Sequence, residues 1–486
     1  MSPKFFLIVF LLIGLLLPGS IASADSLPAN KVYQQPEGPV YIVQEGDSLW
    51  DIALRFKVSM DDLARANGIS DPGQLVVGER LVIPGLPGIQ GVLTTSSVSY
   101  GETLRSLSRS YQVSIDILSK LNHLTSPTEL YSGSTLIIPE EKPNNGASRR
   151  SLLLPGQSLL ELAIQHGVSP WTYVIANDLP GIWGALPGDV LHIPVQSGSK
   201  DEDPGPGALP EAISAVKLAP LPMVQGEVAE FEITSTVIIS ITGSLAGHNL
   251  NFFSSTPGSY TSLQGIHAMT EPGIYSLALT TTLPSGVPFS FAQTVLISPG
   301  NYPFDPVLIV SPETIDPAVT KPEDAQWAAL TATATRQKLW QGIFASPAPA
   351  PFSDCWPSRY GNRRSYNGSA YTYFHTGLDF CGGIGTEILA PAAGRVVFAG
   401  PLTVRGNATI IDHGWGIYSA YLHQSEFRVK VGDLVQPGQV IGLVGGTGRV
   451  TGPHLHWEIW AGGVQVDPMN WLNQVYPNQD SLSLPG

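Results

Sequence analysis

Hydrophobic positions between residues 40 and 85 change their spacing in a fixed order. A short apolar run at 41–43 predicts a strand, and Gly46 then turns the chain. Apolar residues recur at helical spacing over 49–56 and again over 58–67, and a second apolar run at 81–83 predicts a return strand. The pattern therefore predicts a small α+β unit with the order strand, helix, helix, strand (βααβ).

The same unit recurs twice more, at a constant interval of 55 residues. Each copy has a glycine, an asparagine 21 residues later and a proline 17 residues after that. These positions are Gly46, Gly101 and Gly156; Asn67, Asn122 and Asn177; and Pro84, Pro139 and Pro194. Fixed offsets of this kind indicate internal duplication. We therefore expect three modules, over residues 40–85, 92–140 and 149–195.

The first copy, with YIVQEGDSLWDIALRF, VSMDDLARANGI and GERLVIP, resembles the LysM module across residues 41–84. The other two resemble it more loosely, because the opening tyrosine is lost and the third has HGVSPWTYVIAND in place of the second helix. The resemblance implies binding of glycan that contains N-acetylglucosamine, which in this setting is peptidoglycan. The alternative is that one or more copies keep the fold as spacers without a ligand.

Residues 196–215 are rich in glycine, proline and charged residues, which predicts a flexible linker. The spacing of the apolar residues changes after this linker. Apolar residues then alternate with polar ones, and Pro-Gly and Pro-Ser-Gly sequences separate the runs. Alternation broken by turns predicts an all-β sandwich of immunoglobulin-like type over 216–300. Its histidines, His248 and His267, have no ligand-like neighbours in sequence, so we expect structural or solvent-exposed roles for them.

Helical spacing returns over residues 322–340, within a predicted helical connector at 318–342. Pro322 suits the first turn of a helix and Lys338 suits the last. Four residues fall on one side of this helix and predict packing against a neighbouring domain: Trp327, Leu330, Ala334 and Lys338. The proline-rich stretch 346–351 then predicts a stiff spacer before the last domain.

Composition and charge narrow the class of protein. A chain of 486 residues with 43% hydrophobic content predicts three to five packed domains. The formal net charge is -14, and no basic patch is visible, so we expect no binding to nucleic acid. We expect a monomer.

The first 24 residues predict a secretory signal peptide. Lys4 precedes an apolar run at 5–17, and Pro18, Gly19 and an Ala-Ser-Ala sequence follow it. The alternative is an uncleaved membrane anchor, but the run is shorter than the ~20 residues that a bilayer span needs. We therefore expect a secreted, extracytoplasmic protein that is associated with the cell wall and has no membrane span in its mature chain.

The only two cysteines are Cys355 and Cys381. An oxidising compartment permits them to pair, which would close a loop of 26 residues. The alternative, two thiolates that bind a metal, is disfavoured because neither cysteine belongs to a CxxC pair and nearby histidines already supply ligands.

Five of the ten histidines fall between residues 375 and 456. On a strand, His454 and His456 point to the same side, and a tight turn through Gly377 can bring His375 and Asp379 to one point. Two histidines and a carboxylate around an open position form a catalytic zinc arrangement. The spacing leaves open which of His454 and His456 is the ligand.

Three motifs in this stretch, HTGLD, YLH and HLHWE, are similar to the signatures of the lysostaphin-type, or LytM-type, zinc endopeptidases of peptidoglycan. The likeness extends over residues 358–471 and implies a mainly antiparallel β domain, which we place at 350–475. It implies that His375, Asp379 and His456 hold Zn²⁺, whereas His423 and His454 act on the substrate. His413 matches a structural position.

These patterns together predict a secreted zinc endopeptidase that LysM modules target to peptidoglycan. The alternative is a non-catalytic, wall-binding regulator that activates a separate amidase. A third possibility is a latent enzyme whose zinc site is covered by an upstream segment until processing. The sequence leaves open which peptide bond is cut.

Overall fold

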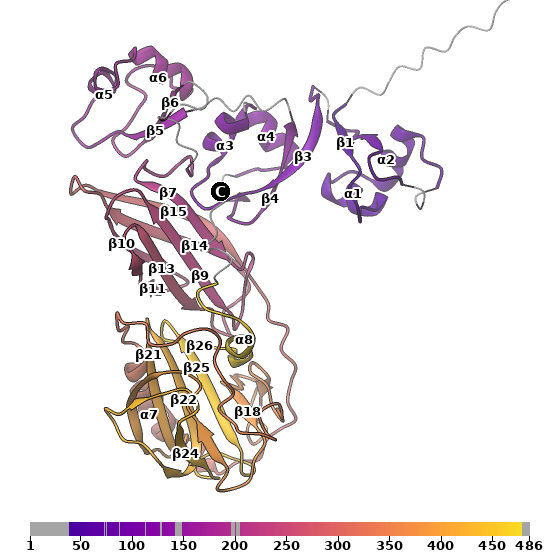
Figure 1. Cartoon of the computed structure of the whole chain (residues 1–486). Helices are drawn as coiled ribbons and strands as arrows, with labels where there is room; N and C mark the ends of the chain where they lie inside the picture. Colours follow the sequence, from indigo (N-terminus) through magenta and orange to yellow (C-terminus); the bar gives the residue numbers. More distant parts are fainter. Residues whose placement is uncertain are drawn as a thin grey trace, which may run out of the picture. The chain divides into compact units, whose positions relative to one another are not determined.

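The computed structural model describes residues 38–478 except 72, 74, 87, 112, 127–128, 141–147, 196–199 and 201–204 (Figure 1). The predicted signal peptide and part of the predicted linker lie outside these ranges. Within them, no helix has the length and apolar character to cross a bilayer.

The βααβ order recurs in all three predicted repeats. The strands and helices are β1 (Val40–Ile42), α1 (Leu49–Arg55), α2 (Met60–Asn67) and β2 (Arg80–Val82); β3 (Val92–Ser97), α3 (Leu104–Tyr111), α4 (Ile115–Leu121) and β4 (Thr135–Glu140); β5 (Ser148–Leu152), α5 (Leu159–Gln165), α6 (Pro170–Ala176) and β6 (Val190–Pro194). The first and last strands of each repeat pair antiparallel. Because β1 also pairs with β3, the first two repeats share one sheet.

The repeated asparagine joins the second helix of each repeat to its last strand. The Asn67 amide donates to Leu63 O and Val82 O at 2.8 Å, and its Oδ1 accepts from Val82 N at 2.6 Å. Asn122 and Asn177 make the equivalent three bonds. This set of three hydrogen bonds, which we call the asparagine clamp, occurs in each repeat and explains the fixed position of the asparagine in the sequence.

Two sheets pack face to face after the repeats. Their strands are β7 (Ile213–Ala219), β8 (Met223–Val224), β9 (Val228–Ser235), β10 (Ser240–Leu245), β11 (His248–Leu250), β12 (Phe253–Thr256), β13 (Ser259–Gly265), β14 (Gly273–Thr282) and β15 (Pro288–Ser298). The sheet orders are β11-β10-β14-β15-β8 and β12-β13-β9-β7, around a shared apolar core. The immunoglobulin-like class of this sandwich stays a prediction.

The described part of the predicted flexible linker, residues 205–215, is packed and does not form an open linker. Leu209 and Ile213 are buried in the sandwich core. The guanidinium of Arg150, from β5, donates to Pro206 O, Leu209 O and Ile213 O. These contacts tie the third repeat to the sandwich.

The predicted connector helix is wrong at both ends. A short 3-10 helix, η3 (Pro312–Ile315), precedes α7 (Pro317–Thr331), which begins earlier because Asp316 caps it with Pro317 in the first turn. It ends at Thr331, and the next residues bond to the C-terminal sheet instead. Ala334 and Lys338 are therefore not helical. Trp327, Leu330 and Ala334 nevertheless pack against the neighbouring domain, as predicted.

The proline-rich stretch 346–351 does not act as a spacer, contrary to the prediction. Phe344 and Ala348 are buried in the core of the C-terminal domain. Backbone hydrogen bonds also join Ala345 N to Pro391 O and Leu389 N to Pro347 O. The core of this domain includes Trp340 and so begins before the predicted boundary at residue 350.

The C-terminal domain is built on a nine-stranded sheet with the central order β18-β25-β22-β21-β20-β23. Its elements are β16 (Arg363–Arg364), β17 (Tyr373–Phe374), β18 (Leu378–Phe380), β19 (Glu387–Leu389), β20 (Gly394–Pro401), β21 (Asn407–Gly414), β22 (Ile417–Phe427), β23 (Leu434–Val435), β24 (Val440–Val444), β25 (Leu455–Ala461), β26 (Val464–Val466) and α8 (Pro468–Asn473). Odd-numbered residues of β25 enter the main core, and even-numbered ones face the side that α7 covers. Cys355 and Cys381 form a disulfide with their Cα atoms 5.4 Å apart.

Candidate metal centre

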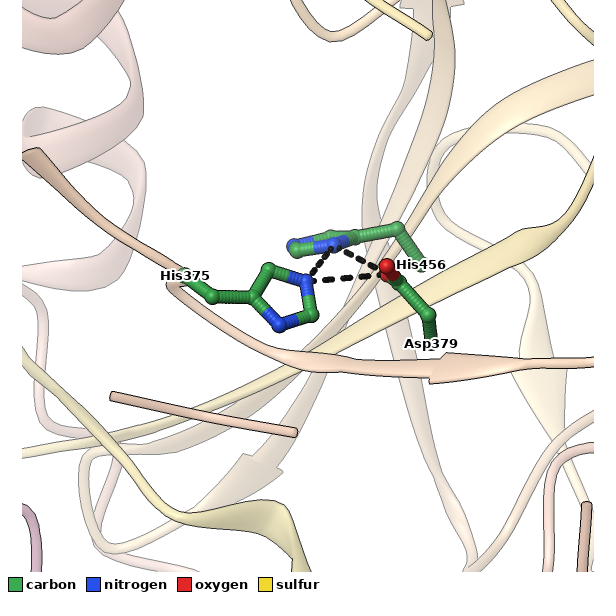
Figure 2. Close-up of side chains that lie close together, drawn as sticks. All are labelled: His375, Asp379 and His456. Atoms are coloured by element: carbon green, nitrogen blue, oxygen red, sulfur yellow. Dashed lines mark hydrogen bonds and ion pairs between the residues drawn. The ribbon is translucent and has the colours of Figure 1, made fainter. Parts of the chain in front are cut away.

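Three side chains converge where β18 pairs with β25 in the C-terminal sheet (Figure 2). Asp379 on β18 lies directly opposite His456 on β25, and the HTGLD turn brings His375 to the same point. His375 Nε2 and His456 Nδ1 are 3.0 Å apart, and each is 2.9 Å from Asp379 Oδ1. Gly377 permits this approach, because a Cβ atom there would lie 2.3 Å from Trp457 O.

The hydrogen bonds around these groups leave a lone pair on each of the three converging atoms. His375 Nδ1 donates to Arg359 O at 2.7 Å, so Nε2 carries no proton when the ring is neutral. His456 Nε2 faces the Glu458 carboxylate at 3.3 Å, which leaves Nδ1 to point at Asp379. Burial lowers the pKa of His375 to about 4, which keeps that ring neutral. When both rings are neutral, three lone pairs meet at this point, and a cation placed between them would remove their mutual repulsion.

The spacing of the three atoms fits a zinc ion. Nitrogen and oxygen ligands lie about 2.0–2.1 Å from tetrahedral zinc, which puts them roughly 3.3 Å from one another. Separations of 2.9–3.0 Å are close to that value. All three residues are buried, and three protein ligands leave the fourth position of a tetrahedral zinc ion open.

A buried carboxylate supports His456. Glu458 lies two residues further along β25, on the same face. Its Oε1 accepts from Thr376 Oγ1 at 2.6 Å and Gln465 Nε2 at 3.0 Å, and its Oε2 accepts from Trp460 Nε1 at 2.9 Å and Trp327 Nε1 at 3.2 Å. Burial alone would raise the pKa of Glu458, but the hydrogen bond and charge of His456 lead the groups that lower it to about 2. A carboxylate behind a ligating imidazole orients the ring and increases its basicity.

Asp379 is supported in the same way by an arginine. Arg364 Nη2 lies 3.7 Å from Asp379 Oδ2, and its Nε lies 3.2 Å from Asp305 Oδ2. Burial would raise the pKa of Asp379, but His375 and His456 lower it well below its usual range. The carboxylate is therefore ionised, with Oδ1 directed at the two imidazoles.

His423 and His454 lie beside this cluster. The His423 ring is 5.2 Å from the His454 ring and 5.9 Å from the His456 ring, between centroids, and His454 Nε2 is 3.5 Å from Asp379 Oδ1. Each ring donates its Nδ1 proton to a backbone carbonyl, Thr447 O for His423 and Gly452 O for His454. These bonds fix the orientation of both rings, with each Nε2 on the side away from the backbone carbonyl that Nδ1 contacts.

The backbone at His423 has a left-handed conformation, with φ 63°. Non-glycine residues seldom adopt this region, and those that do cluster at functional sites. Burial and the two neighbouring imidazoles lower the pKa of His423 well below its usual value, so the ring is neutral. His413, by contrast, bonds to Ala393 O and Ser419 Oγ and lies within the scaffold.

Sequence reasoning missed the supporting residues. The alternation H-x-H-x-E along β25 places Glu458 on the same face as His456, so this pattern could have revealed it. Helical spacing predicts that Trp327 packs against a neighbouring domain, but no pattern places Arg364 or Trp327 at the site, because each reaches it from a distant segment.

Comparison with known proteins agrees with this geometry. Residues 373–468 match the family described as Peptidase family M23, and residues 41–84 and 97–139 match the LysM domain. The chain carries an M23 peptidase domain. The predicted ligands and the two further histidines all fall within the matched segment of this M23 domain.

Similar proteins include the DD-carboxypeptidase/endopeptidase Mpg of Neisseria meningitidis, 44% identical over 96 residues, which are 20% of this chain and 22% of that protein. The peptidoglycan DD-endopeptidase ShyA of Vibrio cholerae is 45% identical over 95 residues, again 20% and 22% of the two chains. The matches thus span about a fifth of the length of these relatives. Among solved structures, a putative peptidase M23 from Pseudomonas aeruginosa is 26% identical, with TM-score 0.38, and covers 52% of this chain and 94% of its own.

Proposed function

We propose that this protein is a secreted, peptidoglycan-binding zinc endopeptidase that hydrolyses peptide bonds in the stem or cross-bridge peptides of the cell wall. The convergence of His375, Asp379 and His456 carries the proposal, because three lone pairs meet where a cation is needed. The M23 match over the same residues supports the reaction class. The name of the Vibrio relative, a peptidoglycan DD-endopeptidase, supports a peptidoglycan substrate.

His375 Nε2, Asp379 Oδ1 and His456 Nδ1 would hold the metal. Zinc bound there would supply Lewis acidity toward a peptide carbonyl and a water of lowered pKa. Glu458 and Arg364 hold two of these ligands in place from behind. The chain thus provides a ligand set whose orientation is fixed before substrate binds.

His423 and His454 would handle the protons of the reaction. Each presents an unprotonated Nε2, because its Nδ1 proton is committed to a carbonyl oxygen. Such a nitrogen can accept a proton from the attacking water and then, as N–H, stabilise the oxyanion that forms on the substrate. Proton transfer to the leaving amine completes hydrolysis.

The repeats would hold the enzyme at its insoluble substrate. Residues 41–84 and 97–139 match the LysM domain, and we assign the third βααβ unit, 149–195, to the same class because it carries the same asparagine clamp. The sandwich at 216–300 would act as the spacer between wall-binding and catalytic parts.

The test is zinc analysis combined with digestion of purified sacculi that carry a covalent dye. We expect about one zinc per chain, release of soluble dye-labelled muropeptides, loss of release with a chelator and recovery on adding zinc. A protein that binds walls but releases no dye, with or without zinc, would instead support the non-catalytic regulator. Mass spectrometry of the released products would identify the bond that is cut.

A further inference from the structure

We infer that Trp327 of helix α7 is a positioning residue for the metal ligand His456, acting through the carboxylate of Glu458. The inference rests on the proposed zinc site. Trp327 Nε1 donates to Glu458 Oε2 at 3.2 Å, and the other oxygen of that carboxylate faces His456 Nε2 at 3.3 Å. The indole N–H is thus connected through one carboxylate to Nε2 of His456, the ring nitrogen opposite the proposed ligand atom Nδ1.

Small side chains on the sheet make room for the indole to reach the carboxylate. On β22, Ala420 lies directly opposite Glu458, and Ile410 of β21 lies opposite Ala420. Trp327 is fully buried against these residues and against Ala408. The indole therefore shares one buried cluster with the alanines at 408 and 420.

Helix α7 is fixed to the sheet at a second point. The Glu323 carboxylate accepts backbone N–H bonds from Thr403, Val404 and Arg405, each at 2.9 Å. The Arg405 guanidinium lies 4.8 Å from the centre of the Trp327 ring, and Arg405 O accepts from His423 N. Residues 403–405 lie in the turn between β20 and β21, and Figure 1 shows α7 beside β21 and β22, whose apolar residues share a cluster with Trp327. One helix is therefore bonded to the supports of both His456 and His423.

Helix α7 lies outside the segment that matches the M23 family, residues 373–468. The metal site of this chain therefore depends on a residue that the M23 match does not include. Without the indole N–H, Trp460 is left as the sole side-chain donor to Oε2 among the described residues. The carboxylate is then free to turn, and the bond that orients His456 weakens.

Zinc affinity of the full chain tests this inference. The variant Trp327→Phe keeps a buried ring and removes the N–H, and Trp340→Phe is the matched control. Trp340 is also buried, and its Nε1 donates to Tyr476 O at 3.0 Å, in the main core. Loss of a supporting group around a metal ligand weakens metal affinity about 10–100-fold. We expect the zinc dissociation constant, measured against a chromophoric chelator, to rise about tenfold in Trp327→Phe and to stay within about twofold in Trp340→Phe.

Equal zinc affinity in Trp327→Phe and the wild type would overturn the inference, and so would equal losses in both variants, because a general packing defect would then explain them. If Trp327→Phe does not fold, a benzothienyl analogue of tryptophan at position 327 preserves the shape of the indole without its N–H, and the same tenfold loss is expected. If the wild-type chain itself binds no zinc, the proposed function fails and this inference fails with it. Tight zinc binding by the wild type with no effect at position 327 would reject the inference alone.

Discussion

The two histidines of HLHWE have different surroundings although they are two residues apart. His456 lies within β25, opposite Asp379, where its Nδ1 meets the carboxylate at 2.9 Å. His454 precedes β25 and bridges to Gly445, and its Nε2 stays 3.5 Å from the same oxygen. The register of the sheet thus brings His456, and not His454, into the cluster with His375 and Asp379, which alternation alone could not predict.

This distinction predicts different losses in two alanine variants. His456→Ala should lose both bound zinc and dye release, because it removes one of three ligands. His423→Ala should retain zinc and lose about 10²–10⁴-fold in the rate of muropeptide release, the usual contribution of a proton-transferring group. Metal analysis and digestion kinetics on each variant would check this, with His123→Ala as a control outside the site. Zinc loss in His423→Ala would show that the assignment of ligands is wrong.

At this scale, the convergence of His375, Asp379 and His456 could be predicted because they lie in short motifs whose spacing reflects local geometry. His375 and Asp379 share one turn, and His456 lies on a strand with a clear alternation. Arg364 and Trp327 could not be predicted, because their contacts depend on how separate segments pack. The roles of the individual histidines remain predictions.

At the scale of elements, the constant position of an asparagine in each repeat reports a structural requirement. Asn67→Ala leaves Val82 N–H and two carbonyl oxygens without this partner, which should destabilise the first repeat by about 2–3 kcal/mol. Asn67→Asp keeps the size of the side chain but directs a carboxylate oxygen at Leu63 O and Val82 O, so the loss should be at least as large. Urea unfolding followed by hydrogen exchange in residues 40–85 would measure it. Asn249→Asp, at an exposed position, is the control. If neither Asn67 variant loses stability relative to this control, the asparagine clamp does not stabilise the repeat.

A buried carboxylate in β9 predicts a pH dependence of stability. Burial raises the pKa of Glu230 from 4.5 to about 7, and its two oxygens accept from Asn478 N. Between these pH values the folded chain retains a proton that the unfolded chain has lost, so stability falls as pH rises through this window. The free energy of unfolding falls by up to about 3 kcal/mol across this window, because each unit of difference between the folded and unfolded pKa corresponds to about 1.4 kcal/mol.

Replacing this carboxylate should remove that part of the pH dependence. Glu230→Gln has no charge to bury, so we expect it to unfold at a higher temperature than the wild type at pH 8 and at a similar temperature near pH 4.5. Thermal unfolding across this range, followed by tryptophan fluorescence, would check the prediction. Parallel curves for the two proteins would show that Glu230 does not titrate in this window.

Helix α7 shows why element boundaries were harder to predict than element types. The sequence indicates a helix near Trp327, but Asp316 and Pro317 start it earlier than the spacing of apolar residues suggests. It stops at Thr331 because Thr335 and Leu339 bond to the loop and strand around His413. Tertiary hydrogen bonds, which no local pattern encodes, therefore set its end.

At the scale of the whole molecule, the repeats are attached to the rest of the chain in different ways. In the second repeat, Tyr100 is buried in the sandwich core, and its hydroxyl donates to Leu277 O and Phe291 O. In the third, Arg150 bonds to backbone oxygens that lead into β7. The first repeat is joined to the second through the pairing of β1 with β3. Removal of the first repeat therefore leaves the packed contacts of Tyr100 and Arg150 intact.

This difference permits a test of tethering that spares the catalytic domain. A chain that lacks residues 38–91 should digest soluble muropeptides at the normal rate, because His375, Asp379 and His456 and their supports are untouched. On intact sacculi the shortened chain should be several-fold slower. Each linked binding module raises the effective concentration of the enzyme at the wall, and this chain lacks one of them. Parallel assays on the two substrates, with thermal unfolding to verify the fold, would measure this ratio. An equal fall on both substrates would indicate damage to the fold, and an unchanged rate on sacculi would show that the first repeat does not tether the enzyme.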